Sequence, residues 1–464
     1  MKMQNWQRGE VLLEQYEVLG ILGEGGMGTV YKVHHRGWNI DLAVKSPQQE
    51  IFTRAGGKEN FMREAETWVS LPLHPHIVSC YYVRIVDEIP RIFAEYVAGG
   101  SLADWIRSRR LYEGGPQQAL ERMLDIAIQF AWGLHAAHEQ GLVHQDIKPA
   151  NVMMSSEGIA KVTDFGLAKA RVMVGEQEER NGESGQRSIL VSARGMTPAY
   201  CSPEQMVGNA LSRKTDIWSW AVSLLEMFVG DVIWRSGTLA REILASYEPQ
   251  DAAIPPLPTE VGTLLTRCFA FQPEDRPETM LEVATRLQEI YAHEMEQAYP
   301  REAPQPTKAL AATLNNRALS LFDLGKVEQA MCVWEQALQT DPQHLEANYN
   351  RGVVLWRQGK LSDDALINQL KMVRAAQFQS GWGPICLPRS TWNKGGSLLL
   401  FICWKKLHNW YFIARKSSNC VNTRKNSFPL MKNYTCMTCM GVRRKASVPM
   451  DAGLCVAMTI MTVM

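Results

Sequence analysis

Two short polar motifs constrain this chain more than any other feature: HQDIKPAN at 144–151 and VTDFGLA at 162–168. They bring Asp146, Asn151 and Asp164 close together in the sequence. Taken alone, each of these residues is most simply an exposed polar position in a loop. In this order and spacing, they predict one shared site that binds charged groups.

The residue types in the two motifs suit phosphoryl transfer. That reaction needs negative charge neutralised on three phosphates and an acceptor hydroxyl held in line with the transferred group. We expect Asn151 and Asp164 to hold two Mg²⁺ ions. Asp146 would orient the acceptor hydroxyl and accept its proton, and Lys148 would steady the γ-phosphate.

A glycine-rich stretch, LGEGGMGTV at 22–30, has the composition of a phosphate-binding loop. Gly23, Gly25 and Gly28 stand in G-x-G-x-x-G register, and glycine lets backbone N–H groups approach phosphate oxygens. A plain hairpin and a dinucleotide site are the alternatives for such a stretch on its own. The nucleotide contacts expected here are Leu22, Gly23, Glu24, Gly25, Gly26, Met27, Gly28, Thr29 and Val30.

Lys45 ends the apolar run LAVKS at 42–46. A strand end that meets solvent is the simplest interpretation, but a cation at this place can also hold the α- and β-phosphates. The second role requires a carboxylate that positions the lysine. Glu64, nineteen residues later on the predicted helix NFMREAETWVSL, is the best candidate. Glu66 is the runner-up and lies about 200° further around the helix.

Residues 16–292 resemble a eukaryotic-type protein kinase, most of all the bacterial serine/threonine kinases. Besides the motifs above, the resemblance rests on CSPEQ at 201–205, KTDIWSWAVSLLEM at 214–227 and PEDRP at 273–277. It implies that Glu204 pairs with Arg276 and that Asp216 braces the backbone of the catalytic loop. It also implies ATP as the phosphoryl donor, Mg²⁺ as the metal and protein hydroxyls as acceptors.

The branch of the family and its adenine site are expected from the same resemblance. Lys148 together with Thr197 is typical of kinases that act on serine and threonine. The expected adenine contacts are the backbone groups of Glu95 and Val97 and the side chains of Ala43 and Met153. Ala94 stands where such kinases usually carry a bulky gatekeeper residue, which is explained either by variation in packing or by an enlarged back pocket.

Gln145 is the one departure within the catalytic loop, because similar kinases usually carry arginine there. In the family, that arginine binds a phosphate on the activation segment. Gln145 is neutral and cannot form a charge-assisted, bidentate pair with phosphate. We therefore expect the exchange to alter how the enzyme is switched on and to leave the chemistry intact.

The order of sequence patterns predicts an α+β, two-lobed kinase fold followed by helical hairpins. Alternating β-branched and aromatic runs indicate a small, mostly β lobe at about 16–98 with one helix near 59–71. Helical periodicity indicates a larger lobe at about 99–292. Three prolines between Pro300 and Pro306 mark a linker, assigned to 293–310.

An internal repeat follows the linker, within residues 311–376. NNRALSLFDLGKVEQAMCVWEQALQTDP at 315–342 aligns with NYNRGVVLWRQGKLSDDAL at 348–366, with Gly325 matching Gly359. A period of about 34 residues resembles the tetratricopeptide repeat, while a chance helical hairpin is the alternative. About one and a half repeats are visible, and they are expected to bind a protein partner.

The last segment, 377–464, differs in composition from the rest of the chain. It carries twelve Lys or Arg residues and one acid, Asp451, whereas residues 1–376 hold 37 basic and 47 acidic residues. A zinc knuckle around CMTC at 436–439 and a basic nucleic-acid arm are conceivable functions. The loss of acids and of helical periodicity favours a frame-shifted or disordered end instead.

Composition and hydropathy favour a cytoplasmic protein with no nucleic-acid or membrane partner. The net charge is +1. The longest apolar run, SLLLFICW at 397–404, is far below the roughly 18 residues of a membrane span. The four cysteines before residue 377 are widely spaced, as in reduced proteins.

Two functions from different classes remain at this point. The first is an active, ATP-dependent serine/threonine protein kinase whose repeats recruit substrates or regulators. The second is a pseudokinase scaffold that acts through its repeats. The retention of Lys45, Glu64, Asp146, Asn151 and Asp164 favours the enzyme.

Overall fold

The computed structural model of the 464-residue chain describes residues 5–25, 28–48, 57–87, 89–165, 169–170, 197–249, 251–304, 310–378, 399–400 and 413–414. The chain divides into two compact units, Met1–Gln377 and Phe378–Met464. In the second unit, the described residues are the end of one helix and two short antiparallel strands, β11 (Leu399–Leu400) and β12 (Ile413–Ala414). The CMTC motif lies outside the described residues.

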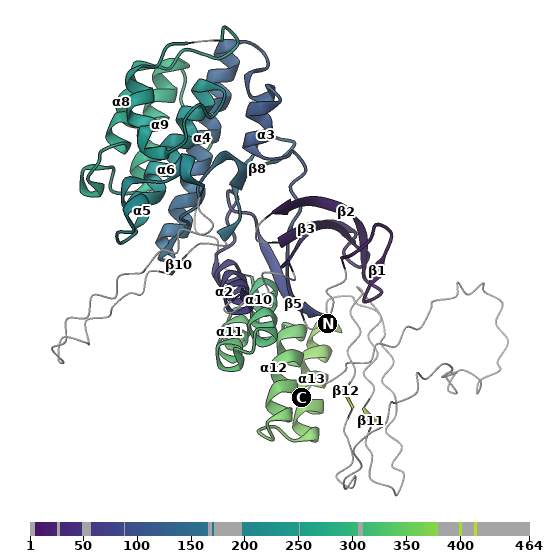
Figure 1. The fold of residues 1–464 in the computed structure, drawn as a ribbon. Helices are drawn as coiled ribbons and strands as arrows, with labels where there is room; N and C mark the ends of the chain where they lie inside the picture. Colours follow the sequence, from purple (N-terminus) through teal and green to yellow (C-terminus); the bar gives the residue numbers. More distant parts are fainter. Residues whose placement is uncertain are drawn as a thin grey trace, which may run out of the picture. The chain divides into compact units, whose positions relative to one another are not determined.

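The first unit begins with a six-stranded sheet in the order β1-β2-β3-β4-β6-β5, with one helix, α2, between β4 and β5 (Figure 1). Its elements are β1 (Val11–Leu12), β2 (Tyr16–Gly25), β3 (Gly28–His35), β4 (Ile40–Ser46), α2 (Gly57–Ser70), β5 (Cys80–Val86) and β6 (Ile89–Glu95). All neighbouring strands are antiparallel. The expected β-rich lobe with one helix is confirmed.

Alternation along the strands gives this sheet a buried face. Tyr31 and Val33 on β3 and Leu42 and Val44 on β4 are each two residues apart, so their side chains leave the sheet on one side. All four are at most 2% exposed and form one apolar cluster with Phe93. This cluster holds the strands that carry the glycine-rich loop and Lys45.

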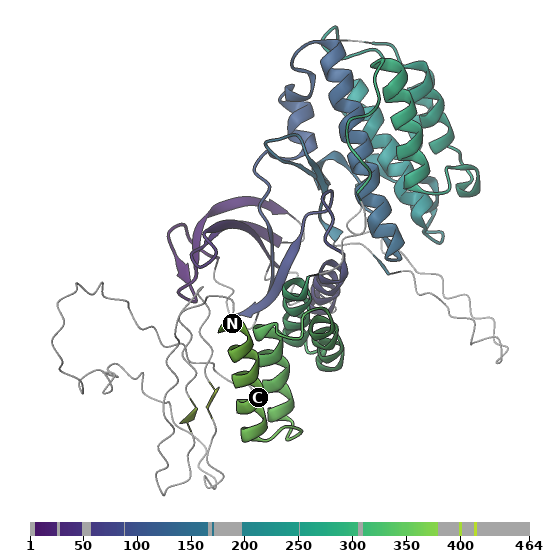
Figure 2. The same ribbon diagram turned by 180° about the vertical axis from the view of Figure 1, so that it is seen from behind.

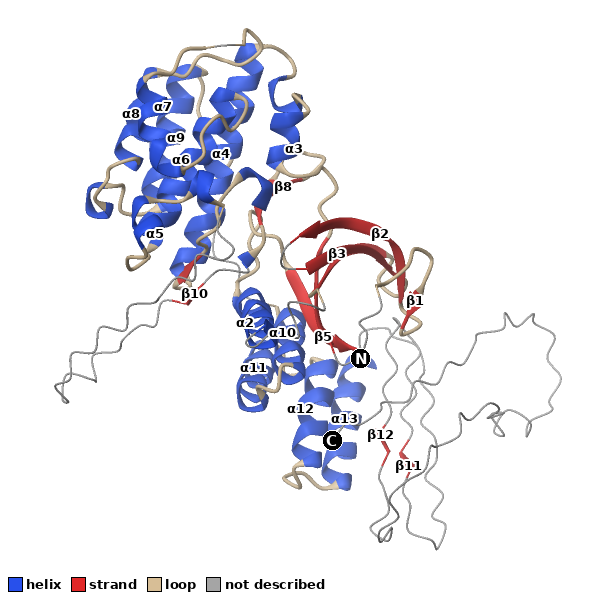
Figure 3. Cartoon of the chain, viewed as in Figure 1, coloured by secondary structure: helices blue, strands red, loops and turns tan. Residues whose placement is uncertain are grey.

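Helices dominate the next part of the chain (Figure 3). The helices are α3 (Leu102–Arg107), α4 (Pro116–Glu139), α5 (Pro203–Val207), α6 (Arg213–Val229), α7 (Ala240–Ala245), α8 (Thr259–Cys268) and α9 (Met280–Glu294), and the short 3₁₀ turns are η1 (Arg110–Tyr112), η2 (Pro149–Asn151), η4 (Pro198–Tyr200), η5 (Gly237–Leu239) and η6 (Pro273–Asp275). Short strands β7 (Leu142–Val143), β8 (Val152–Met154), β9 (Ala160–Val162) and β10 (Lys169–Ala170) form two small antiparallel pairs, β8 with β9 and β7 with β10. The predicted α-rich lobe is present.

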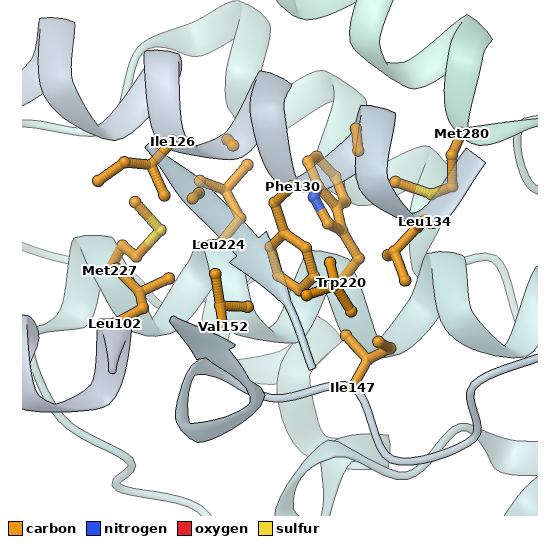
Figure 4. Packing of buried hydrophobic residues seen from close by; sticks show 14 of the residues in the cluster. Leu102, Ile126, Phe130, Leu134, Ile147, Val152, Trp220, Leu224, Met227 and Met280 are labelled. Atoms are coloured by element: carbon orange, nitrogen blue, oxygen red, sulfur yellow. The ribbon is translucent and has the colours of Figure 1, made fainter. Parts of the chain in front are cut away.

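The core of this lobe lies between α4 and α6. Ile126, Phe130 and Leu134 recur every four residues on α4, which places them on one face of the helix. Figure 4 shows them beside Trp220 and Leu224 of α6. All five side chains are at most 2% exposed. The same core includes Ile147, within the HQDIKPAN motif, and Val152, directly after it, and these two residues anchor the motif.

The segment after α9 follows the surface of the larger lobe. Arg301 donates from Nε and Nη2 to the Asp125 carboxylate of α4 at 2.8 and 3.0 Å. The Tyr299 hydroxyl donates to the same carboxylate at 2.6 Å. The first half of the expected linker is therefore held against α4, whereas residues 305–309 lie outside the described residues.

Four helices close the first unit: α10 (Ala311–Asp323), α11 (Val327–Thr340), α12 (Leu345–Arg357) and α13 (Asp363–Phe378). Gly325 and Gly359 have φ values of +80° and +71° in the turns that follow α10 and α12, which explains why these glycines match in the repeat. The second hairpin includes its second helix, so the structure contains two helical hairpins where the sequence indicated one and a half. The extension was missed because α13 shares few residues with α11.

A buried polar network joins the two hairpins. The Asn315 side-chain oxygen accepts hydrogen bonds from Trp334 Nε1 at 3.1 Å and from Asn350 Nδ2 at 2.9 Å. At Gly352 a Cβ would lie 2.6 Å from Leu366 Cδ1, so a larger residue there would need the leucine side chain to shift. Among the described helices, none combines the length and apolar character needed to cross a membrane.

Candidate active site

Lys45 sits between two carboxylates from distant parts of the sequence. Its Nζ lies 2.5 Å from Glu64 Oε1 on α2 and 2.7 Å from Asp164 Oδ1. Burial lowers the pKa of Lys45, but attraction to Asp164 and Glu64 outweighs it, so that the pKa is raised overall. Burial raises the pKa of Asp164, and Lys45 outweighs this effect and lowers it overall. Lys45 is therefore held as a cation.

The structure decides between the two candidate partners of Lys45. Glu64 is buried and faces Lys45, whereas Glu66 is half-buried and pairs with Lys326 Nζ at 3.6 Å. Two residues along a helix correspond to a rotation of about 200°, so the two glutamates face different neighbours. The expected pairing of Lys45 with Glu64 is present.

The catalytic-loop residues converge around one carboxylate. Lys148 Nζ donates to Asp146 Oδ2 and to Thr197 Oγ1, each at 2.7 Å, and Thr197 Oγ1 donates to Asp146 Oδ1 at 3.1 Å. Asn151 Nδ2 donates to the Asp146 backbone oxygen at 2.8 Å and to its Oδ2 at 3.2 Å. Asp146 is thus fixed in place by three side chains, each of which the sequence singled out.

Gln145 adopts a left-handed backbone conformation, with φ of +71°. Asp216 stabilises it: Oδ1 accepts the Gln145 N–H at 2.9 Å, and Oδ2 accepts the His144 N–H at 2.8 Å. The expected bracing of the loop by Asp216 is therefore present. His138 Nε2 of α4 also lies 2.8 Å from Asp216 Oδ2. No pattern along the chain indicates this histidine, because the contact depends on how α4 packs against α6.

The side chain of Gln145 is turned into the protein. It is buried and its Nε2 lies 3.5 Å from the Val143 carbonyl oxygen, while the backbone carbonyl oxygen of Gln145 accepts a bond from Gln205 Nε2 at 2.8 Å. Ser184, Ser188, Ser192 and Arg194, in the segment between Asp164 and Glu204 where an activating phosphate would be attached, lie outside the described residues. The consequence of the exchange for activation thus stays a prediction.

A buried ion pair joins Arg276 and Glu204 within the larger lobe. Arg276 donates to the two oxygens of Glu204 at 2.7 and 2.9 Å, and both residues are at most 6% exposed. Burial raises the pKa of Glu204, but hydrogen bonds and charge from Arg276 outweigh it and lower the pKa overall. The remaining Arg276 N–H groups donate to the carbonyls of Ala270, Lys214 and Phe271. The pairing expected from the motifs is present.

The glycine-rich loop joins β2 to β3. At Gly28 a Cβ would lie 2.3 Å from the Ser46 backbone oxygen, so no larger residue fits, whereas Gly23 and Gly25 face open space. Glu24 and Leu22 are exposed, while Thr29 is buried. Gly26 and Met27, at the tip, lie outside the described residues. The open space at the two glycines is what close approach by a phosphate requires.

The residues expected to contact adenine include apolar side chains from both lobes. Val30 on β3, Ala43 on β4 and Met153 on β8 are each half-buried, and Val97 is buried. The Glu95 carboxylate forms an ion pair with Lys161 Nζ at 2.6 Å. Hydrogen bonds from this stretch to an adenine base would therefore come from its backbone. Ala94 is 3% exposed, so neighbouring side chains cover it.

The donor set fits a magnesium ion that is shared with phosphates. Among the described residues, no group of three or more His, Cys, Asp or Glu side chains could hold a metal by itself. Mg²⁺ is usually bound by one or two protein ligands together with substrate phosphates and water. The Nδ2 of Asn151 faces Asp146, which leaves its Oδ1 as a ligand, and Asp164 keeps Oδ2 beyond the oxygen that contacts Lys45.

Comparison with known proteins agrees with this geometry. A protein kinase domain model matches residues 16–294, and a TPR repeat model matches residues 318–359. A probable serine/threonine-protein kinase of Clostridium perfringens is 31% identical over 288 residues, covering 61% of this chain and 39% of the relative. Serine/threonine-protein kinase PknB of Mycobacterium tuberculosis is 28% identical over 304 residues, covering 63% of this chain and 45% of the relative.

A probable serine/threonine-protein kinase of Streptomyces coelicolor is 36% identical over 228 residues, covering 47% of this chain and 31% of the relative. The alignments therefore span less than half the length of these relatives. The kinase model alone covers more than half of the present chain, and its limits enclose every residue of the site described above. The chain belongs to the protein kinase family, carries a tetratricopeptide repeat region and is similar to bacterial serine/threonine kinases.

Proposed function

We propose that residues 16–294 transfer the γ-phosphoryl group of ATP to serine and threonine hydroxyls of proteins. The observation that carries the proposal is the position of Lys45, paired at once with Glu64 and Asp164. A lysine fixed by two carboxylates is held at one point, so it can bind α- and β-phosphates without first reorganising. The second carboxylate belongs to the motif that suits magnesium.

The groups around Asp146 support the same reaction. Asp146 accepts bonds from Lys148 and Thr197. A bound substrate hydroxyl would take the place of the Thr197 hydroxyl on the carboxylate, where its proton can pass to Asp146 during attack. Lys148 would then be free to turn towards the transferred phosphoryl group. Magnesium ions held by Asn151 and Asp164 would neutralise charge on the phosphates.

The adenine would lie between the apolar side chains of the two lobes. Val30 and Ala43 would cover one face of the base and Met153 the other, while backbone groups of Glu95 and Val97 would pair with its edge. Their half-buried surfaces are the partly exposed apolar atoms that a planar base would cover.

The repeats and the compartment follow as further parts of the proposal. Paired helices of the tetratricopeptide type support recruitment of a protein partner. A cytoplasmic location is supported by the free thiols of Cys80, Cys201, Cys268 and Cys332 and by the need for ATP. A pseudokinase scaffold has no observation in its favour, because the charged residues that such proteins lose are all present.

The test is phosphate transfer from labelled Mg-ATP to a generic serine/threonine substrate. Lys45→Met and Asp146→Asn should each lower turnover by at least about a hundredfold, because the first removes the charge that holds the α- and β-phosphates and the second the charge that accepts the proton of the acceptor hydroxyl. Lys360→Met is the matched control, since Lys360 is exposed in the turn between α12 and α13 and should leave the rate unchanged. Transfer that survives Lys45→Met at near wild-type rate would refute the assignment.

A further inference from the structure

The outermost strand of the kinase sheet is covered by a helix of the repeat region. Among the strands that the structure describes, β5 is the last in the order of the sheet, so none of them pairs with its outer side. Val83 and Ile85 lie two residues apart, so their N–H groups point to the same side. The Val83 N–H donates to Ser320 Oγ on α10 at 2.9 Å. Asp323, also on α10, faces the Ile85 N–H; burial raises the pKa of its carboxyl group to about 6 overall, although this N–H lowers that pKa.

The two acceptors lie on the same face of α10. Ser320 and Asp323 are three residues apart, which places them on one face of the helix about 4.5 Å apart along its axis. Ser320 is fully buried, and its hydroxyl proton is donated to the Asn316 carbonyl at 2.8 Å, which leaves a lone pair for Val83. Two N–H groups at the edge of the sheet therefore face side-chain oxygens in place of a neighbouring strand.

The same end of α10 also reaches α2, the helix that carries Glu64. Lys326 pairs with Glu66, and Leu324 is 5% exposed within the buried cluster that contains Phe61 and Ala65 of α2. Both views of the chain show α10 beside α2 and β5 (Figures 1 and 2). α10 therefore contacts α2, which carries Glu64, and β5, which is separated from the Lys45 strand β4 by β6.

We propose that Ser320 and Asp323, on the first repeat helix, are positioning residues for the catalytic Lys45–Glu64 pair. By fixing β5 and the adjoining α2 from outside, they keep the buried Glu64 within reach of Lys45. In return, β5 and α2 bury one side of α10, the first helix of the two hairpins. This burial stabilises a stack of only two hairpins. The repeat region then sets the turnover of the kinase in addition to recruiting partners; this inference rests on the proposed function.

The test uses the full-length chain with the double change Ser320→Ala/Asp323→Ala. Loss of the two side-chain acceptors that face the β5 N–H groups should lower kcat by about tenfold. The change in KM for a peptide substrate should be less than about twofold, since Asp146 and its neighbours are untouched. Glu328→Ala, an exposed carboxylate on α11, is the matched control and should leave kcat unchanged. Asp323→Asn, which keeps an acceptor oxygen, should retain most of the rate.

The same changes in a Glu64→Gln background separate positioning from a general loss of stability. If α10 acts through Glu64, the double change should lower kcat by less than about twofold when Glu64 is already replaced. An undiminished tenfold loss in that background would overturn the proposal, as would wild-type kcat in the double variant.

Hydrogen exchange gives a readout that does not depend on activity. The double change should speed amide exchange in α2 and β5 by about tenfold or more and leave α6 unchanged. Unchanged exchange in α2 would refute the positioning role even if the chain proved inactive. Lack of phosphate transfer by the wild-type chain, with faster α2 exchange in the variant, would refute the proposed function and retain the positioning role.

Discussion

Asp216→Asn tests whether the geometry of the catalytic loop depends on one buried carboxylate. Asp216 is fully buried and accepts three hydrogen bonds, from the Gln145 N–H on Oδ1 and from the His144 N–H and His138 Nε2 on Oδ2. Asparagine has the same shape but replaces one acceptor oxygen with an amino group. At least one of the three donors must then face another donor.

The magnitude follows from how these bonds divide between the two oxygens. With the amino group at the Oδ1 position, only the Gln145 N–H loses its acceptor, whereas the other orientation would leave two donors unpaired. Losing a charge-assisted bond costs about 1.5–3 kcal/mol, and the two surviving bonds become neutral and weaker. We therefore expect the free energy of unfolding to fall by about 2–4 kcal/mol.

Activity should respond through Gln145. The left-handed conformation of a non-glycine residue costs about 1–2 kcal/mol, and the bond to Asp216 offsets that cost. Without the bond, Gln145 can relax to a right-handed conformation and move Asp146, the next residue. We expect kcat to fall by at least about tenfold while KM for ATP changes little, because Lys45 and its two carboxylates are not touched.

Urea unfolding and steady-state kinetics on the same preparations provide the assay. Asp231→Asn is the matched control, because Asp231 is exposed and its carboxylate accepts a hydrogen bond from the N–H of Val232, the next residue. The control should change the free energy of unfolding by less than about 0.5 kcal/mol. A similarly small change for Asp216→Asn, with wild-type kcat, would show that the loop does not depend on this carboxylate.

Arg276→Ala should lower the free energy of unfolding by about 3–5 kcal/mol because it leaves a buried charge unpaired, against less than about 1 kcal/mol for the exposed Arg267→Ala. Arg276 holds the pKa of Glu204 below its usual value despite burial. The stability that this ion pair contributes is therefore present above about pH 4.3 and is lost as the pH falls through the folded-state pKa of Glu204. A wild-type free energy of unfolding that stays constant over this pH range would contradict the Arg276–Glu204 pairing. Ala94→Met should weaken ATP-competitive inhibitors that carry bulky aromatic groups by at least about tenfold, and equal potency would show that another side chain already fills the space. Phosphatase-treated enzyme should keep most of its rate because Gln145 cannot bind an activating phosphate, an account that fails if most of the activity is lost.

The sequence determined most of the chemistry of this protein. Asp146, Lys148, Asn151 and Asp164 belong to motifs whose spacing is fixed locally, because a short loop and a strand pair set their positions. The structure brings these residues and Lys45 together as the motifs predicted. Helical and strand periodicity were equally informative, since burial of one face leaves a regular pattern along the chain.

The sequence left other choices to the tertiary structure. Glu64 and Glu66 are both acidic residues on one helix, and only the packing of α2 decides which of them faces Lys45. His138 contacts Asp216 because α4 crosses α6, and no spacing in the sequence encodes that crossing.

The packing of α10 against β5 is the most extensive of the contacts that only the tertiary structure decides. Ser320 and Asp323 lie more than 230 residues after the strand that they contact, and the repeat pattern around them gives no sign of that contact. A serine and an aspartate on a helix are ordinary surface residues until an unpaired strand edge lies against them. Local patterns report which face of an element is apolar, whereas hydrogen bonds between distant elements depend on how those elements pack.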